Sequence, residues 1–217
     1  MMKWILKDYF AAFSWNRVVE MNKKNHLLKN IALYVILVCF IEWLNPVDVL
    51  PCLVAMYVPT LFMMISQQLH PIVVTKLFYL CPMERNERKD LMFKMYFVAI
   101  AIPVAFSAVI NSIFVVCGMC EWTFGVGAVF YMYVFAHPFC AQMINNKIKF
   151  FETLKLTDVL SLVFTTRAHY FLYFSIDVSS PWKMVILSGL ELIGLIIWYW
   201  GWRKARKQML DYESLTL

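Results

Sequence analysis

Six apolar segments follow one another along the chain, and each is long enough to cross the roughly 30 Å hydrocarbon core of a bilayer as a helix. They cover residues 27–44, 47–69, 96–117, 122–143, 156–176 and 182–202. The fifth is less apolar than the others and contains Arg167. The pattern predicts an all-α integral membrane protein with six transmembrane helices.

The first 25 residues show a different, amphipathic pattern. Large apolar side chains share one face of a helical wheel: Met2, Ile5, Leu6, Tyr9, Phe10 and Phe13. Lys3 and Lys7 lie on the other face. A helix of this kind lies in the plane of the membrane surface. We therefore expect an interfacial helix at residues 1–25, followed by a six-span transmembrane domain at residues 26–217.

Composition supports a membrane protein. Hydrophobic residues make up 62% of the chain and charged residues only 16%, whereas about 25% of a soluble domain is charged. The formal net charge is +6, but the basic residues lie between apolar segments. This is typical of membrane loops that face an anionic leaflet. No basic, water-exposed face is then left to bind nucleic acid, so we exclude nucleic acid as a partner. We expect contact with membrane lipid instead.

The distribution of Lys and Arg predicts the orientation. Nearly all of them lie at the N-terminus, in residues 70–94, in residues 147–155 and at the C-terminus. The connections at residues 45–46, 118–121 and 177–181 contain none. Because cytoplasmic loops carry the basic excess, we expect a multi-pass protein of the cell (plasma) membrane with both termini in the cytoplasm.

Four prolines fall within or at the ends of the predicted spans: Pro51, Pro59, Pro103 and Pro138. Each leaves a backbone carbonyl without its helical donor and permits a kink. Such kinks are found both in bundles that move and in static ones.

Two charged residues lie deep within predicted spans. Arg167 and Glu191 are each about 13–14 Å below the outer surface if their helices are regular. Charges at that depth face the bundle interior and find a partner. We expect Arg167 to pair with Glu191 on the neighbouring span, either as a structural ion pair or as a polar patch on a transport path.

Candidate catalytic chemistry is sparse. The six cysteines lie mostly within apolar segments and indicate reduced packing residues, including Cys117 and Cys120, whose spacing resembles a metal or redox motif. No metal site is expected. His70 and Cys81 could form the thiol–base pair of a membrane peptidase. The chain has no Gly-rich phosphate loop, so we expect no ATP binding and no enzymatic activity of its own.

The charged stretch at residues 70–94 carries a resemblance to a known family. It contains Leu80-Cys81-Pro82-Met83-Glu84-Arg85, then Arg88-Lys89 and Lys94, at the start of the third span. With the interfacial helix and six spans, this stretch resembles the permease subunits of ABC-2-type (type V) ABC exporters, in a small bacterial half-transporter form. Phe93 stands where that family has a glycine.

The resemblance implies a transport function and partners. A separate ATP-binding cassette subunit would bind ATP and Mg²⁺, and a second permease copy or a related permease would complete the transporter. The ATPase would dock on the cytoplasmic coupling loop 70–94, at these residues: Lys76, Pro82, Glu84, Arg85, Glu87 and Arg88. The exported solute would be amphipathic, peptide or lipid-like.

The fourth span suits an apolar solute through its aromatic residues: Trp122, Phe124, Phe130, Tyr131, Tyr133 and Phe135. Helix–helix packing explains the same residues equally well. A six-span substrate-binding component of a vitamin importer remains an alternative, although the outer connections are short for a ligand cap. The peptidase based on His70 and Cys81 is another.

Overall fold

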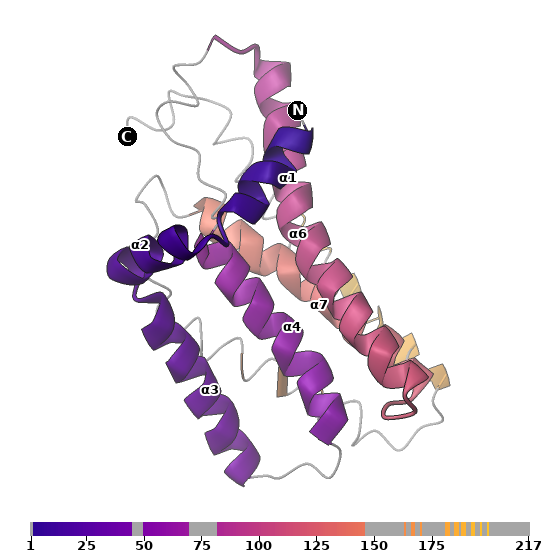
Figure 1. Ribbon diagram of the computed structural model, residues 1–217. Helices are drawn as coiled ribbons and strands as arrows, with labels where there is room; N and C mark the ends of the chain where they lie inside the picture. Colours follow the sequence, from indigo (N-terminus) through magenta and orange to yellow (C-terminus); the bar gives the residue numbers. More distant parts are fainter. Residues whose placement is uncertain are drawn as a thin grey trace.

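The computed structural model describes residues 2–44, 50–69 and 82–145, together with single helical residues between 163 and 199 (Figure 1). The continuous elements are all helices: α1 (Met2–Ala11), α2 (Trp15–Asn25), α3 (Leu27–Leu44), α4 (Leu50–Leu69), α6 (Arg85–Val116) and α7 (Trp122–Asn145). Of these, α3, α4 and α6 are long and apolar enough to cross a membrane. The described part of the chain is therefore all-helical, and its three candidate spans indicate a membrane-embedded protein. Most of residues 156–176 and 182–202 lies outside the described part, so the six-span count stays a prediction.

The first predicted span coincides with α3, and the second with α4 apart from its first residues. In Figure 1, α3 and α4 run side by side in opposite directions, and α6 and α7 form a hairpin. Helix α4 packs against both arms of that hairpin. The main core lies where these helices meet and includes Met56, Met63, Ile100 and Met132.

The N-terminal segment forms two helices rather than one. Backbone N–H groups of residues 12–14 bond to carbonyls of residues 8–11 and close the end of α1. Ser14 then takes an extended conformation and begins α2. Figure 1 shows both helices crossing one end of the bundle, but orientation in the membrane plane stays a prediction.

An aromatic stack ties this segment to the bundle. The ring of Phe13 stacks on Phe62 of α4, with centroids 5.9 Å apart, and Phe62 stacks on Phe106 of α6 at 4.3 Å. Tyr9 is only 1% exposed, whereas Phe10 is 62% exposed. The predicted apolar face is thus divided, since Tyr9 packs against protein and Phe10 points outward.

Helix α6 begins at Arg85 rather than at Tyr96, where the apolar segment starts. A capping box starts it, in which Glu84 caps a backbone N–H of the first turn and the Glu87 carboxylate accepts the N–H of Glu84 at 3.1 Å. Asp90 and Lys94 add an ion pair one turn further on. With 32 residues, α6 is about 48 Å long, well beyond the roughly 30 Å of a hydrocarbon core.

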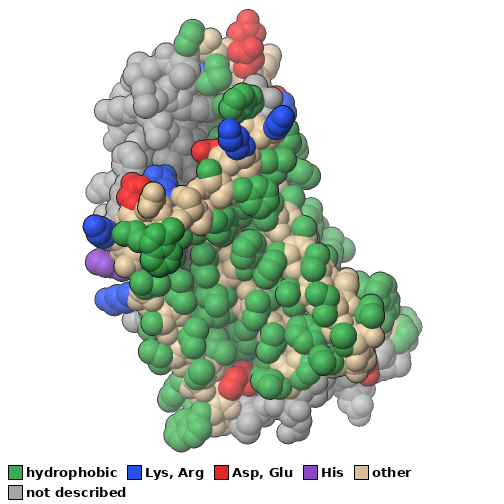
Figure 2. Space-filling model, viewed as in Figure 1, with side chains coloured by type: hydrophobic (Ala, Val, Ile, Leu, Met, Phe, Trp, Pro, Cys, Tyr) green, Lys and Arg blue, Asp and Glu red, His purple; other side chains and the backbone are tan. Residues whose placement is uncertain are grey.

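Charge separates along the bundle in the described part. Figure 2 shows hydrophobic side chains over the long helices, with blue Lys and Arg side chains gathered around α1 and α2. The beginning of α6 adds Arg85 and Lys89 to the same end. An apolar belt with a basic end is the surface expected of a protein that spans a bilayer.

Prolines within α4 and α6 account for two unusual hydrogen bonds. Pro59 has no N–H to donate to the carbonyl of Ala55 one turn earlier, and the side-chain amide of Asn111 on α6 donates to that carbonyl at 3.3 Å. The arrangement is reciprocal.

Pro103 on α6 leaves the carbonyl of Ala99 without its helical donor. The side-chain amide of Gln67 on α4 donates to it at 3.2 Å. Each helix therefore satisfies the carbonyl that proline frees in the other, which fixes the register of the α4–α6 pair.

Candidate functional site in the helical bundle

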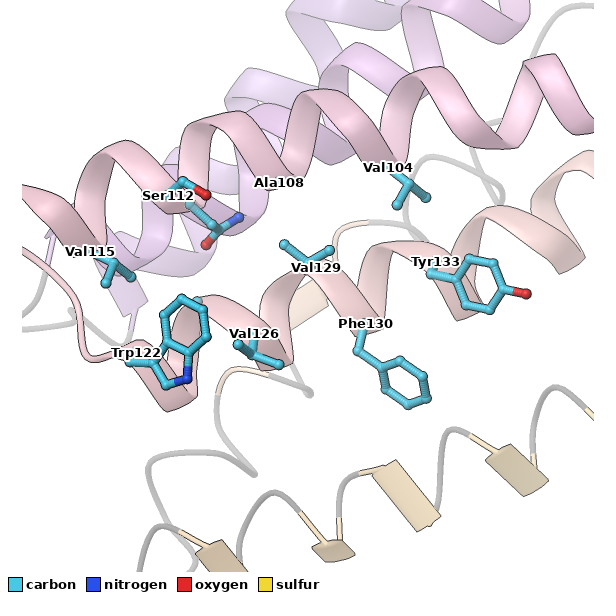
Figure 3. A pocket seen from close by; sticks show the side chains of 11 residues that line it. Val104, Ala108, Ser112, Val115, Trp122, Val126, Val129, Phe130 and Tyr133 are labelled. Carbon is cyan, nitrogen blue, oxygen red and sulfur yellow. The ribbon is translucent and has the colours of Figure 1, made fainter.

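A groove of about 400 Å³ lies between α6 and α7. Its lining is mostly apolar: Val104, Ala108, Asn111, Ser112, Val115, Trp122, Gly125, Val126, Val129, Phe130 and Tyr133. Figure 3 shows Val104 and Val115 of α6 pointing toward α7, with Val129 of α7 pointing back between them. Trp122 lies at the end next to the connection between the two helices. The volume is within the range of small-molecule sites.

Glycine allows the helices to approach closely at one end of the groove. A Cβ at Gly125 would lie 2.8 Å from Cγ2 of Val115. A larger residue at this position would require the Val115 side chain to shift, so Gly125 permits the close contact between the helices there. The connection itself uses Gly118 at φ +68°, a left-handed conformation that glycine tolerates best.

Asn111 gives the groove a defined polar atom. Its side chain is 2% exposed, and Nδ2 donates to the carbonyls of Ala55 and Ser107 at 3.3 and 2.9 Å. These two acceptors require the nitrogen to face them. The amide oxygen Oδ1 is buried and has no hydrogen-bond partner in the described part of the chain. A buried acceptor beside apolar walls favours a ligand that brings its own donor.

A second polar feature is an ion pair within the bundle. The guanidinium of Arg167 lies 3.3 Å from Oε1 of Glu42 on α3, and both side chains are mostly buried. The Tyr57 hydroxyl of α4 donates to the same carboxylate oxygen at 3.5 Å. Tyr57 is seven residues from the start of α4, which places the pair about 10 Å inside the span.

Polar contacts continue from the ion pair deeper into the bundle. The Tyr34 hydroxyl of α3 donates to the Tyr57 carbonyl at 3.1 Å and lies 2.6 Å from the Thr60 hydroxyl of α4. Thus α3 contributes two polar side chains, Tyr34 and Glu42, that contact α4 directly.

The residues around Arg167 connect this network to α7. Val163, Thr166, Arg167 and Tyr170 recur at helical spacing and are all buried. The Thr166 hydroxyl lies 3.0 Å from the Tyr131 hydroxyl of α7.

The ring of Tyr170 is held between two partners. The guanidinium of Arg167 lies 5.2 Å from its centroid, and the ring meets Phe124 of α7 edge-on. The face that carries Arg167 is therefore an interior face, as a charge within a span requires.

The structure gives Arg167 a carboxylate partner other than the expected one. Glu42, which was not the expected partner, lies in contact with Arg167, whereas Glu191 lies outside the described residues. The Arg167–Glu191 pair thus stays a prediction. A carboxylate within an apolar segment was the signal that Glu42 also needed a partner.

The proposed coupling residues gather at the beginning of α6. Pro82, Glu84, Arg85 and Glu87 are exposed, and Arg88 is partly buried. Lys76 lies outside the described residues, as do His70 and Cys81 of the alternative peptidase. The second half of the expected loop 70–94 is therefore helical, and its charges project from a rigid element.

The aromatic residues of α7 divide between two roles. Phe124 and Tyr131 are buried in the core. Trp122, Phe130 and Tyr133 line the groove. The side chain of Phe135 is outside the described part. Packing therefore accounts for Phe124 and Tyr131, whereas an apolar binding surface at Trp122, Phe130 and Tyr133 stays a prediction.

The cysteine in contact with Cys120 is Cys52, not Cys117 of the same short motif. Cys117 is exposed at the end of α6, whereas Sγ of Cys120 lies 3.1 Å from Sγ of Cys52 on α4. Among the described residues, no group of three or more His, Cys, Asp or Glu side chains could hold a metal ion.

No protein-family model matches this chain, and neither does any curated protein or solved structure.

Proposed function

We propose that this protein is the transmembrane permease subunit of an ABC exporter, driven by a separate ATP-binding cassette subunit. In this proposal two permease copies, or this chain and a related permease, form the translocation unit in the cell membrane. Both termini and the beginning of α6 face the cytoplasm. ATP and Mg²⁺ bind to the partner ATPase.

The observation that carries the proposal is the continuity of α6. One helix joins the charged first turns, residues 85–94, to the groove residues between Val104 and Val115. The capping box and the Asp90–Lys94 ion pair keep its first turns helical beyond the apolar segment. A rigid helix of this length transmits a displacement at its polar end directly to the groove.

The chemistry of the groove supports an amphipathic solute. Apolar walls favour an alkyl or aromatic body, because such a body makes close van der Waals contacts with them and leaves no polar group unpaired. The free Oδ1 of Asn111 favours a hydroxyl, amide or ammonium donor on the same molecule. Lipid-like and peptide solutes both combine these features.

Co-purification tests the partner. Reversing Glu84, Arg85 and Glu87 together should abolish association with an ATP-binding subunit isolated from the native membrane. Since this variant also removes the capping box, a second variant, Arg85→Glu with Lys89→Glu, leaves the cap intact and should lose the partner as well.

The matched control reverses another exposed ion pair, Arg17 and Glu20 of α2, whose Nη1 and Oε2 lie 3.0 Å apart. This control should retain the ATPase. A full complement of ATPase on both α6 variants would place the docking site elsewhere, and the absence of any ATP-binding subunit from the unaltered protein would overturn the proposed function.

A further inference from the structure

Two cysteines lie in contact at the end of the bundle opposite the charged start of α6. Cys52 is in the first turn of α4, and Cys120 is in the connection between α6 and α7. Their sulfur atoms are 3.1 Å apart. At this distance either thiol can donate a hydrogen bond to the other.

Exposure differs across the three cysteines of this region. Cys52 is 3% exposed, Cys120 is partly exposed, and Cys117 is fully on the surface. Of the two thiols in contact, a reagent from water therefore reaches Cys120 before Cys52, which lies behind it. This is the arrangement of an attacking and a resolving thiol.

We propose that Cys52 and Cys120 form a regulatory or structural disulfide that links the start of α4 to the α6–α7 connection. The proposal is independent of the transport function and rests on the contact between the two sulfur atoms. In the orientation proposed above, this end faces the outside of the cell, where disulfides persist.

The oxidant is a disulfide of a thiol–disulfide exchange protein or of a small molecule. The Cys120 thiol loses its proton, and its sulfur attacks one sulfur of the incoming disulfide, forming a mixed disulfide and releasing one thiolate. The Cys52 sulfur, after losing its proton, then attacks Sγ of Cys120 and releases the second thiolate. The two released thiolates take up the two protons, so one disulfide is reduced as the other forms.

Burial slows the first step without preventing it. Burial raises the pKa of the Cys120 thiol above its ordinary value, and the contact with Cys52 offsets part of this rise. The exposed Cys117 in the same connection competes for the oxidant. It is therefore the matched control for reactivity without a buried partner.

The link has a mechanical consequence. It would hold α4 to the hairpin at this end, while the reciprocal Asn111 and Gln67 hydrogen bonds hold α4 to α6 further along. Oxidation would then lock α4, α6 and α7 into one unit, and reduction would release α4 at its first turn.

Peptide mapping tests the link. The purified full-length protein is treated with dipyridyl disulfide, free thiols are blocked with N-ethylmaleimide, and peptides are analysed by mass spectrometry without reduction. We expect a Cys52–Cys120 peptide pair in the wild-type protein and in Cys117→Ser. The oxidised protein should have a Tm higher than the reduced protein, on the order of 5 °C.

Two further variants keep the result interpretable. In Cys52→Ser and in Cys52→Ala, Cys120 should remain as a mixed disulfide and the Tm shift should disappear. A dominant Cys117–Cys120 link in the wild type, or unlinked Cys52 in Cys117→Ser after full reaction of Cys120, would overturn the proposal.

Discussion

Helices α3 and α4 are neighbours of similar length and similar hydropathy, yet they occupy different environments. In the most apolar window of each helix, 17% of the residues of α3 are buried, compared with 61% of those of α4. Buried polar side chains occur on both helices but are more numerous on α4. Asn30 and Tyr34 are buried on α3, whereas Thr60, Ser66, Gln67 and Gln68 are buried on α4. Hydropathy therefore identifies both helices as spans, and the larger number of buried polar residues distinguishes the interior one.

The difference has a physical cause. In lipid, an apolar side chain gains little by moving from the acyl chains to the protein interior, so α3 can remain at the periphery. A buried amide or hydroxyl, by contrast, needs a hydrogen-bond partner that only another helix can supply. Polar residues thus direct α4 to the centre of the bundle, and Tyr34 and Glu42 are the points where α3 is attached to it.

The largest expected effect concerns the charge of α3. Glu42→Gln removes the carboxylate that faces Arg167, and we expect it to lower the free energy of unfolding by about 3–5 kcal/mol. Glu42→Gln combined with Arg167→Met should recover much of this loss, because neither charge is then buried alone. Thermal unfolding in lipid nanodiscs measures both variants.

Charge exchange identifies the partner of Arg167. Arg167→Glu with Glu42→Arg should be more stable than Arg167→Glu alone. If Arg167→Glu is rescued by Glu191→Arg instead, Glu191 is the main partner and the contact with Glu42 is secondary.

Truncation of an apolar side chain should destabilise the protein more on α4 than on α3, by a difference smaller than the effect of Glu42→Gln. Met63→Ala on α4 creates a cavity in the core and should cost about 2–4 kcal/mol. Ile36→Ala on α3, where the side chain is exposed to the surroundings of the protein, should change stability by less than about 0.5 kcal/mol. Equal losses in the two variants, measured by the same unfolding assay, would show that α3 is covered by protein in the assembled state.

The smallest effect tests the hydrogen bonds that proline requires. Asn111→Leu leaves the Ala55 carbonyl without a donor and should cost about 1–3 kcal/mol. Pro59→Ala restores a backbone N–H to that carbonyl, so the double variant should be more stable than Asn111→Leu alone. Strictly additive losses, determined in a double-mutant cycle, would contradict the compensation. The pair Gln67→Leu and Pro103→Ala provides an independent repeat.

Hydropathy and charge predict the bounds of some helices and not of others. The bounds of α3 follow directly from the sequence, because both ends of its apolar segment meet polar residues. The start of α6 does not, since hydropathy marks where a helix enters an apolar environment and not where the helix begins. Glu84 and Glu87, spaced as a capping box, were the available signal for an earlier start.

Local sequence patterns could not predict which distant segments of the chain are in contact. Arg167 needed an acidic partner on physical grounds, but only the three-dimensional structure shows that Glu42 lies beside it. Likewise, the spacing of Cys117 and Cys120 gave no indication that Cys52 lies beside Cys120, because Cys52 belongs to another helix. The requirement for a partner is local and predictable, whereas its identity depends on how the helices pack.

Gly125 has a consequence for how a molecule could enter the groove. At that residue α6 and α7 are already in contact through Val115, and the connection that joins them is short. The two helices of the hairpin are therefore held together at the end next to Trp122. Any widening must occur at the other end, near Val104 and Tyr133. A molecule would then enter sideways from the middle of the lipid layer, after leaving water, and its partitioning into the membrane would set the concentration available to the groove.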